Sequence, residues 1–149
     1  MDRAIKIRRA LVADADAVHA VLLAAKDEIP LTCNFETDKY RAWVRDQCKK
    51  REVWLATIDD KVAGVMVMRV YEIFYLVTAP DFQRAGVGRA LVRHAIGSIL
   101  KRYPGGGVIA KARPENSPII ALLTGEGFRP HQILTAQPGW PVYFVGNIR

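Results

Sequence analysis

Hydrophobic and polar positions alternate with two different periods along the 149-residue chain, and the two periods predict both helices and strands. Apolar residues three and four apart share one face of a helix, whereas strict alternation is typical of a half-buried strand. The helical pattern predicts helices over residues 14–26, from 37 or 38 to about 50, 89–101 and 119–124. Short runs that are rich in apolar, β-branched and aromatic residues and are bounded by turn residues predict strands over 5–8, 53–58, 62–68, 72–77, 108–112, 129–134 and 142–148. This order of elements predicts an α/β (α+β) layer structure with a mixed sheet, formed by one domain over residues 1–149.

Composition excludes several classes of protein. Hydrophobic residues make up 50% of the chain and charged residues 25%, which is typical of a folded globular domain. Cys33 and Cys48 are too few for a disulfide framework, and no Cys/His cluster has the spacing of a zinc site. We therefore expect no metal.

The N-terminal segment superficially resembles a signal peptide, because basic residues precede an apolar stretch. Asp14, Asp16 and His19 interrupt that stretch, so an amphipathic helix is the better interpretation. No apolar run approaches the roughly 18 residues of a membrane span. We expect a cytoplasmic protein with reduced cysteines and no membrane partner.

The net charge of +7 has two explanations. A basic protein can bind a polyanion, such as nucleic acid or a phosphorylated ligand, or it can simply have a solvated basic surface. The densest basic cluster, Arg45, Lys49, Lys50 and Arg51, lies where a helix is predicted to end, and cations suit that end of a helix dipole. Because no RNA-binding aromatic signature or helix-turn-helix pattern accompanies the cluster, nucleic acid is not the favoured partner.

The segment from residue 83 to residue 88 carries the clearest chemical signal. It reads Gln-Arg-Ala-Gly-Val-Gly and joins a predicted strand to a predicted helix. Gly86 and Gly88 allow a tight turn whose amide groups point outward at a helix N-terminus, which is a favourable place for a phosphate. Without further evidence, a plain strand-to-helix turn is the simpler alternative. The segment is not a Walker loop, because no Gly-Lys-Ser/Thr follows, and it is not a Rossmann fingerprint, because the third glycine is missing.

This segment resembles the Q/R-x-x-G-x-G/A signature of the GNAT superfamily of acyl-CoA-dependent N-acyltransferases. The residues on either side agree, since Pro80-Asp81-Phe82 precedes the signature and Arg89-Ala90-Leu91-Val92 follows it. Asn116 also stands twelve residues before Phe128 of Gly127-Phe128, as is common in the family. The resemblance implies a GNAT-like fold, with a mixed and mostly antiparallel sheet of about six to seven strands and flanking helices.

The resemblance also implies acetyl-CoA, or another acyl-CoA, as co-substrate. An amine of a small molecule or protein would attack the thioester directly. The implied cofactor-binding residues lie in the central strand, in the glycine-containing loop and at one later position: Leu76, Val77, Thr78, Gln83, Arg84, Ala85, Gly86, Val87, Gly88, Arg89 and Asn116. Arg93 could add positive charge at the rim, and a backbone N–H of Val77 or Thr78 could stabilise the developing oxyanion.

Glu72 is the candidate general base, since some protein-lysine acetyltransferases of the superfamily carry a catalytic glutamate eleven residues before this signature. The pKa of an alkyl ammonium group lies about three units above neutral pH, so the removal of its proton costs about 4 kcal/mol and a base is useful. The alternative is a solvated glutamate at the end of a hairpin.

The usual general acid is missing from the pattern. Many family members place a tyrosine five residues before the Phe of Gly-Phe, where this chain has Leu123. Tyr75 and Tyr143 are possible substitutes, although tyrosines in strands usually pack. For His19 and His94 we expect solvent-facing roles rather than catalysis.

Two alternatives to an N-acetyltransferase stay open. One is a catalytically silent acyl-CoA-binding module, which the loss of the acid favours, and the other is a nucleic-acid-binding domain. The sequence does not identify the acceptor amine, although the positive net charge argues mildly against polycationic acceptors. Residues 142–148 could pair with a second copy in a homodimer.

Overall fold

Seven strands form one sheet in the order β1-β2-β3-β4-β5-β7-β6 in the computed structural model, which describes residues 4–26, 37–70, 72–103, 107–112, 117–130 and 142–146. All neighbouring strands are antiparallel except β4 and β5, which are parallel. The strands are β1 (Lys6–Arg9), β2 (Val53–Ile58), β3 (Lys61–Arg69), β4 (Glu72–Thr78), β5 (Val108–Ala112), β6 (Phe128–Pro130) and β7 (Val142–Gly146). The expected mixed, mostly antiparallel sheet is confirmed.

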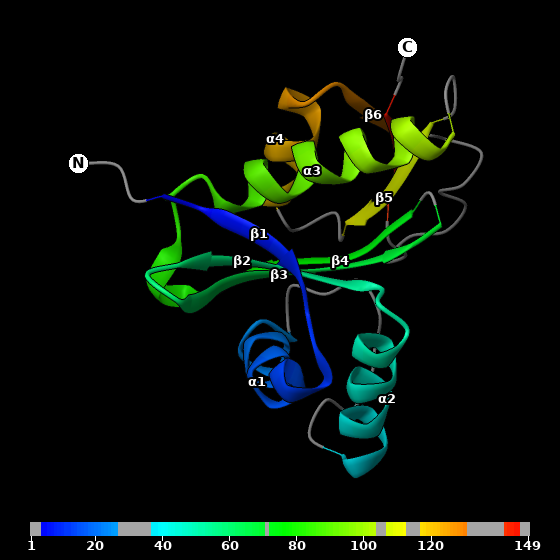
Figure 1. Ribbon diagram of the computed structural model, residues 1–149. Coiled ribbons are helices and arrows are strands. Elements are labelled where there is room, and N and C mark those ends of the chain that lie inside the picture. The colour runs from blue at the N-terminus through cyan, green and yellow to red at the C-terminus, as the bar shows by residue number, and fades with distance from the viewer. Residues whose placement is uncertain are drawn as a thin grey trace.

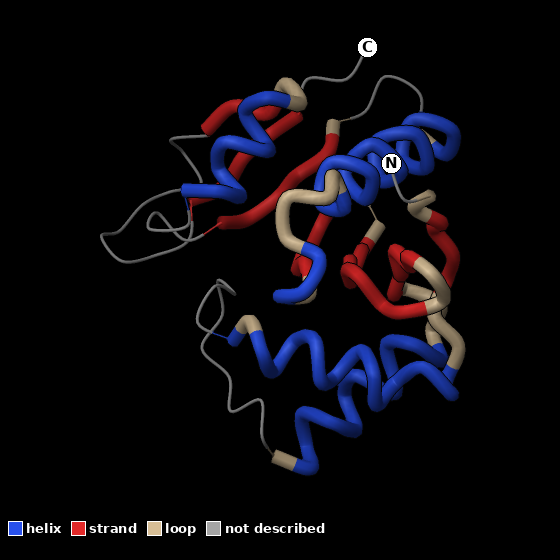
Figure 2. Tube along the Cα trace, turned by 90° about the vertical axis from the view of Figure 1, so that its left-hand side faces the viewer, coloured by secondary structure: helices blue, strands red, loops and turns tan. Residues whose placement is uncertain are grey.

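Helices cover both faces of the sheet (Figures 1 and 2). They are α1 (Ala15–Ala24), α2 (Asp38–Lys49), α3 (Val87–Arg102) and α4 (Ser117–Gly125). Helices α1 and α2 lie on one face, while α3 and α4 lie on the other (Figure 1). Within the described residues, no helix is both long enough and apolar enough to cross a membrane.

The helix termini follow from local sequence. Thr37 caps α2, because its side-chain oxygen accepts a hydrogen bond from the Tyr40 backbone N–H at 3.2 Å. Helix α3 begins at Val87, two residues earlier than expected, because Gly86 adopts the left-handed conformation at φ +83° and ends the loop there. The prediction of a loop through residue 88 was therefore too long.

Two apolar clusters hold the layers together, one on each face of the sheet. The first packs α3 and α4 against the sheet, with Leu91, Ile99, Leu123 and Phe128 almost fully buried. The second packs α1 and α2 against the opposite face, around Val18, Leu22 and Val44. Cys48 belongs to the second cluster, and burial raises the pKa of its thiol to about 11.

A register shift in the middle of the sheet changes which face the side chains of β4 meet. Val67 pairs with Tyr75 but Met68 pairs with Ile73, so Phe74 is an extra residue in β4. As a result Ile73 packs in the α3 cluster, whereas Tyr75 and Val77 pack in the α1–α2 cluster.

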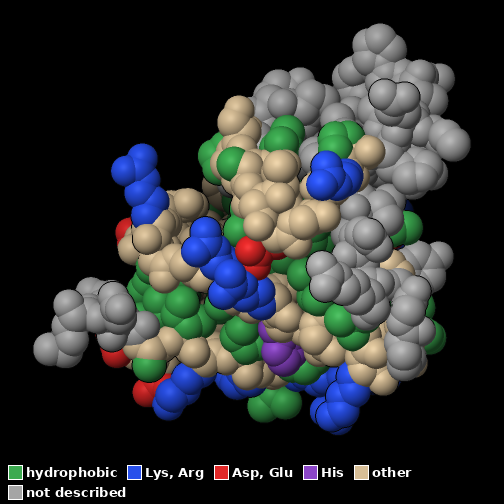
Figure 3. Space-filling model, turned by 90° about the horizontal axis from the view of Figure 1, so that it is seen from above, with side chains coloured by type: hydrophobic (Ala, Val, Ile, Leu, Met, Phe, Trp, Pro, Cys, Tyr) green, Lys and Arg blue, Asp and Glu red, His purple; other side chains and the backbone are tan. Residues whose placement is uncertain are grey.

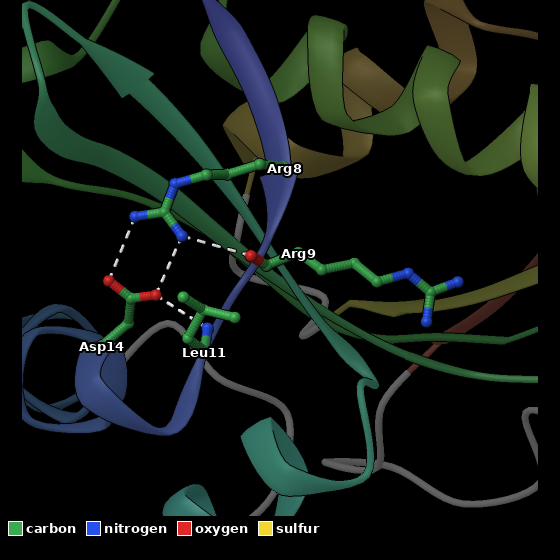
Figure 4. A network of polar contacts seen from close by, with 4 residues as sticks. All are labelled: Arg8, Arg9, Leu11 and Asp14. Carbon is green, nitrogen blue, oxygen red and sulfur yellow. Dashed lines mark hydrogen bonds and ion pairs between the residues drawn. The ribbon is translucent and has the colours of Figure 1, made fainter.

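An ion pair ties β1 to the start of α1 (Figure 4). The Arg8 guanidinium donates two hydrogen bonds to the Asp14 carboxylate, at 2.8 and 3.1 Å. Asp14 Oδ2 also accepts a hydrogen bond from the Leu11 backbone N–H at 2.7 Å. The hydrogen bond from Arg8 is the main reason that the pKa of Asp14 lies below its ordinary value of 3.8.

We expect Asp14→Asn to lower the free energy of unfolding at neutral pH by up to about 1 kcal/mol, since the ion pair is partly exposed. A carboxyl group with a lowered pKa stabilises the fold above its unfolded-state pKa, and this contribution disappears as the pH falls through the folded-state pKa. The difference between wild type and variant, measured by urea unfolding, should therefore shrink on acidification below about pH 4.

Candidate active site

The loop between β4 and α3 is a short turn fixed by its own backbone. After β4 the chain forms one 3₁₀ turn at Pro80–Phe82, and Gln83 then donates a side-chain hydrogen bond to the Thr78 carbonyl at 3.1 Å. Arg84 and Gly86 both adopt positive φ, of 64° and 83°. Gly86 has open space around the position of a side chain, so its conformation rather than its surroundings requires glycine.

The N-terminus of α3 presents unpaired amides at the end of this loop. The first hydrogen bond within the helix runs from the Ala90 N–H to the Gly86 carbonyl at 3.0 Å. The N–H groups of Val87, Gly88 and Arg89 precede it and have no partner within the helix, while Gly86 has no side chain that could cap them. The helix dipole adds about half a positive charge at this point, so the turn is suited to an anionic group.

The buried side chain of Val87 anchors the turn to the sheet. Gly64 on β3 lies directly beneath it, and a Cβ atom at Gly64 would come within 2.5 Å of Val87 Cγ1. Val87 is only 1% exposed. The absence of a side chain at position 64 therefore sets how closely the turn approaches β3.

A cavity of about 490 Å³ opens beside these amides. Its walls are the end of β4, the loop, the first turn of α3 and one face of α4: Leu76, Thr78, Gln83, Arg84, Gly86, Val87, Gly88, Arg89, Pro118, Ile119 and Leu122. Arg84 and Arg89 give the loop side positive charge. Leu76, Ile119 and Leu122 give the other side an apolar surface, so the cavity suits a ligand with an anionic end and a less polar chain.

Three residues of the α4 wall were missed by sequence reasoning: Pro118, Ile119 and Leu122. Ile119 and Leu122 are three residues apart and share a helix face, which is the signal that could have found them. An ion pair between Arg93 Nε on α3 and Glu126 Oε1, at 2.6 Å, joins the end of α4 to α3. Arg93 is thus engaged in holding α4 and is not among the residues that line the cavity.

Eight of the eleven residues expected to bind the cofactor line this cavity: Leu76, Thr78, Gln83, Arg84, Gly86, Val87, Gly88 and Arg89. Two others do not. The Val77 side chain is buried in the α1–α2 cluster on the other face of the sheet, and Ala85 is exposed on the loop. Asn116 lies outside the described residues.

Strands β4 and β5 separate along the cavity side of β4. Their pairing is limited to Glu72 with Ile109 and Ile73 with Ala110, although β4 continues to Thr78. The Ala79 N–H donates to the Ala63 carbonyl on β3 at 2.8 Å, and alternate residues of a strand direct their N–H groups to the same side. The N–H of Val77 therefore faces β3, whereas those of Leu76 and Thr78 face the open side. Of the two expected oxyanion donors, only Thr78 has this orientation.

Glu72 occupies the opposite end of β4 from the loop. It is half-buried, pairs with Arg69 across the β3–β4 hairpin and lies beside β5. Four residues separate it from Leu76, or about 13 Å of strand. Glu72 does not line the cavity, so the strand connects the candidate base to the anion-binding turn without placing the two in contact.

Aromatic rings cover the first half of β4 on the side of α2. The Trp43 ring centroid lies 6.2 Å from that of Phe74 and 5.8 Å from that of Tyr75. The Arg69 guanidinium carbon lies 4.2 Å from the Phe74 ring centroid. This cluster puts a positive charge beside the hairpin that carries Glu72, which would disfavour a highly cationic ligand there.

Several weaker candidates have structural roles. Tyr75 is 2% exposed and Leu123 is 1% exposed, so both are core residues. The side chain of Tyr143 lies outside the described part of the chain.

The expectation that His19 and His94 face solvent was wrong: His19 is buried, and the half-buried His94 ring packs 4.2 Å from that of Trp54. Burial lowers the pKa of His94, and the positive charge of Arg9 lowers it further. Among the described residues, no group of three or more His, Cys, Asp or Glu side chains could hold a metal ion.

Comparison with known proteins agrees with this geometry. Residues 49–130 match the family model for an acetyltransferase (GNAT) domain. A curated "[Ribosomal protein bS18]-alanine N-acetyltransferase" from Salmonella typhimurium is 34% identical over 79 residues, which are 48% of this chain and 51% of that protein. The match thus spans about half the length of this curated relative.

Solved structures share the fold at low sequence identity. A putative acetyltransferase from Salmonella typhimurium with its cofactor acetyl-CoA has a TM-score of 0.73 at 21% identity, covering 95% of this chain and 91% of that one. A ribosomal-protein-alanine N-acetyltransferase from Brucella melitensis has a TM-score of 0.73 at 20% identity, covering 96% and 99%. Ard1 from Thermoplasma volcanium has a TM-score of 0.78 at 17% identity, covering 98% and 99%.

Proposed function

The chain belongs to the GNAT acetyltransferase family, and from this premise we propose that it transfers an acetyl group from acetyl-CoA to a primary amine. The observation that carries the proposal is the cavity of about 490 Å³ at the N-terminus of α3, in which free amides and two arginines meet an apolar wall. We propose that the acetyltransferase domain extends over residues 1–149. The fold matches above, which cover nearly the whole chain, support this extent.

The residues of the cavity fit the two chemically different parts of acetyl-CoA. The amides of Val87, Gly88 and Arg89 would hold the diphosphate, with Arg84 at the rim. The apolar side chains of α4 would cover the pantetheine arm. Acetyl-CoA would supply the activated acyl group. Leu76 and Thr78, which line the cavity on the side of β4, would lie along the pantetheine arm. A role for Asn116 in contacting the arm stays a prediction.

Two groups on β4 would carry the chemistry. Glu72 would accept the proton of the attacking amine, directly or through a water molecule. The open N–H of Leu76 or Thr78 would stabilise the developing negative charge on the thioester oxygen. The thiolate has a pKa of about 8.5, so it can take a proton from water near pH 7 without the tyrosine that Leu123 replaces.

We propose that the acceptor is a protein N-terminal amine. The curated relative and one of the solved structures are named as ribosomal-protein-alanine N-acetyltransferases, which supports this class. An α-amino group has a pKa of about 7.7–8.0, so its deprotonation at neutral pH costs far less than that of a lysine. A cytoplasmic location and a homodimer through residues 142–148 stay predictions.

Titration calorimetry and a thiol-release assay test the proposal together. We expect saturable binding of acetyl-CoA, followed by CoA release with a short peptide that begins with alanine. The same peptide with a blocked N-terminus and one internal lysine is the matched control, and it should release at least about tenfold less CoA because of the higher lysine pKa. Binding without release across a panel of amines would favour a silent acyl-CoA-binding module, whereas no binding would contradict the proposal.

A further inference from the structure

A second cavity, of about 640 Å³, opens at the other end of α3. It lies between the end of β1, the turn from α2 to β2, the β3–β4 hairpin and the last turn of α3. We call it the basic cleft, because its charged residues are five cations and one carboxylate: Arg9, Lys50, Arg51, Lys101, Arg102 and Glu52. Helix α3 has 16 residues and is about 24 Å long, and the basic cleft shares no lining residue with the first cavity.

Most of the positive charge in the basic cleft is uncompensated. Among the described residues, no carboxylate lies within ion-pair distance of Arg51, Lys101 or Arg102, and only Lys50 is paired, with Asp46 at 3.1 Å. Two helices end here, but each helix terminus offsets only about half a charge. Cations that merely complement helix dipoles would not need to converge on one cavity from three separate elements.

The one aromatic ring in the basic cleft is already covered. The Arg9 guanidinium carbon lies 4.7 Å from the Trp54 ring centroid, and the His94 ring packs 4.2 Å from it. Arg9 also donates a hydrogen bond to the Arg51 carbonyl at 2.9 Å, which fixes its position. Arg9 therefore lies over a face of the Trp54 ring on which an unpaired base would otherwise stack, and such stacking is the usual feature of single-strand recognition.

We propose that the basic cleft binds the phosphate backbone of a nucleic acid duplex. Exposed Lys and Arg side chains without a stacking surface suit phosphate groups, which are contacted without regard to base sequence. Figure 3, the view from above, shows Lys and Arg side chains along the lower margin of the described surface, with Asp and Glu side chains among them at its left end. The cleft lies apart from the first cavity, so this proposal does not rest on acetyl transfer. The sequence did not favour nucleic acid, because no RNA-binding aromatic signature or helix-turn-helix pattern accompanies the basic residues. That the cations meet around one cavity is a finding of the structure.

Fluorescence anisotropy with a labelled 20-base-pair RNA duplex tests the proposal on the full chain. We expect binding at 50 mM salt, and a loss of affinity of at least about 20-fold in the double variant Lys101→Glu/Arg102→Glu. The slope of log affinity against log salt concentration is negative, and each lost phosphate contact reduces its magnitude by about 0.9. The slope of the double variant should therefore be smaller in magnitude than that of the wild type by about 2. The matched control is Lys39→Glu/Arg41→Glu, at the far end of α2, which changes the net charge equally and should lose less than about threefold.

Competition experiments show whether the basic cleft prefers a nucleic acid duplex to other anions. A DNA duplex should compete with the RNA, whereas ATP and polyglutamate at equal charge should compete poorly. Absence of wild-type binding, equal losses in both double variants, or equal competition by polyglutamate or ATP would overturn the proposal. The affinity for acetyl-CoA should be the same in the wild type and in both double variants, because the substitutions lie outside the first cavity. A negative result for duplex binding therefore leaves the acetyl-transfer proposal untouched. Circular dichroism and the milder Lys101→Gln/Arg102→Gln variant guard against loss of fold.

Discussion

Replacement of Glu72 by glutamine is expected to lower the rate of acetyl transfer at neutral pH by at least about 100-fold, because a positioned general base contributes about 10²–10⁴. Glutamine keeps the size of the side chain but cannot accept a proton. Acetyl-CoA affinity should not change, since Glu72 lies at the other end of β4 from the anion-binding turn and does not line the cavity. Steady-state kinetics and titration calorimetry on the same preparation separate the two effects.

The pH profile distinguishes a base from a residue that only supports the hairpin. As the pH rises toward the pKa of the acceptor amine, more of the amine is already deprotonated and a base matters less. An α-amino group is already roughly one-tenth deprotonated at pH 7, so the deficit of Glu72→Gln should shrink by up to about tenfold at alkaline pH, and the part that remains is base catalysis in the transition state. Glu52→Gln, a matched change of a glutamate outside the proposed acetyl-transfer site, should leave the profile as in wild type. A Glu72→Gln rate equal to wild type across the range would remove Glu72 from the mechanism.

The glycine-containing loop could be predicted from sequence because its chemistry is local. Gly86 needs its left-handed conformation whatever surrounds it, and the same short segment supplies the turn, the free amides and the start of α3. The short apolar runs likewise predicted the strands, and the continuous runs of β2 and β3 agree with a central sheet that helices cover on both faces.

Features that depend on packing between distant segments could not be predicted in this way. The extra residue at Phe74 comes from the register between β3 and β4, and it decides which face Tyr75 and Val77 meet. The α4 wall of the cavity exists because Leu123 and Phe128 pack in the same apolar cluster as Leu91 of α3, more than 30 residues earlier in the chain. His94 was expected to face solvent because its packing partner, Trp54, lies on a different element.

Replacement of Gly88 by valine should weaken acetyl-CoA binding by at least about 100-fold, or about 2.7 kcal/mol. A Cβ atom at this position would lie 2.8 Å from Leu122 Cδ2, and it would stand between the amides of α3 and the α4 wall. The Leu122 side chain can move, but the space open to it is the cavity that it lines. The substitution therefore fills the cavity rather than the core, and we expect the melting temperature to change little.

Gly97→Val is the matched control, because Gly97 lies in the same helix and an added Cβ there would meet nothing within 4 Å. Both changes give α3 a residue with a higher helix propensity than glycine, so any difference between them reports on the cavity. Titration calorimetry should give wild-type affinity for Gly97→Val and greatly reduced affinity for Gly88→Val. Equal acetyl-CoA affinity in the two variants would mean that the coenzyme binds away from the first turn of α3, because no ligand held on those amides could tolerate the valine side chain between them and α4.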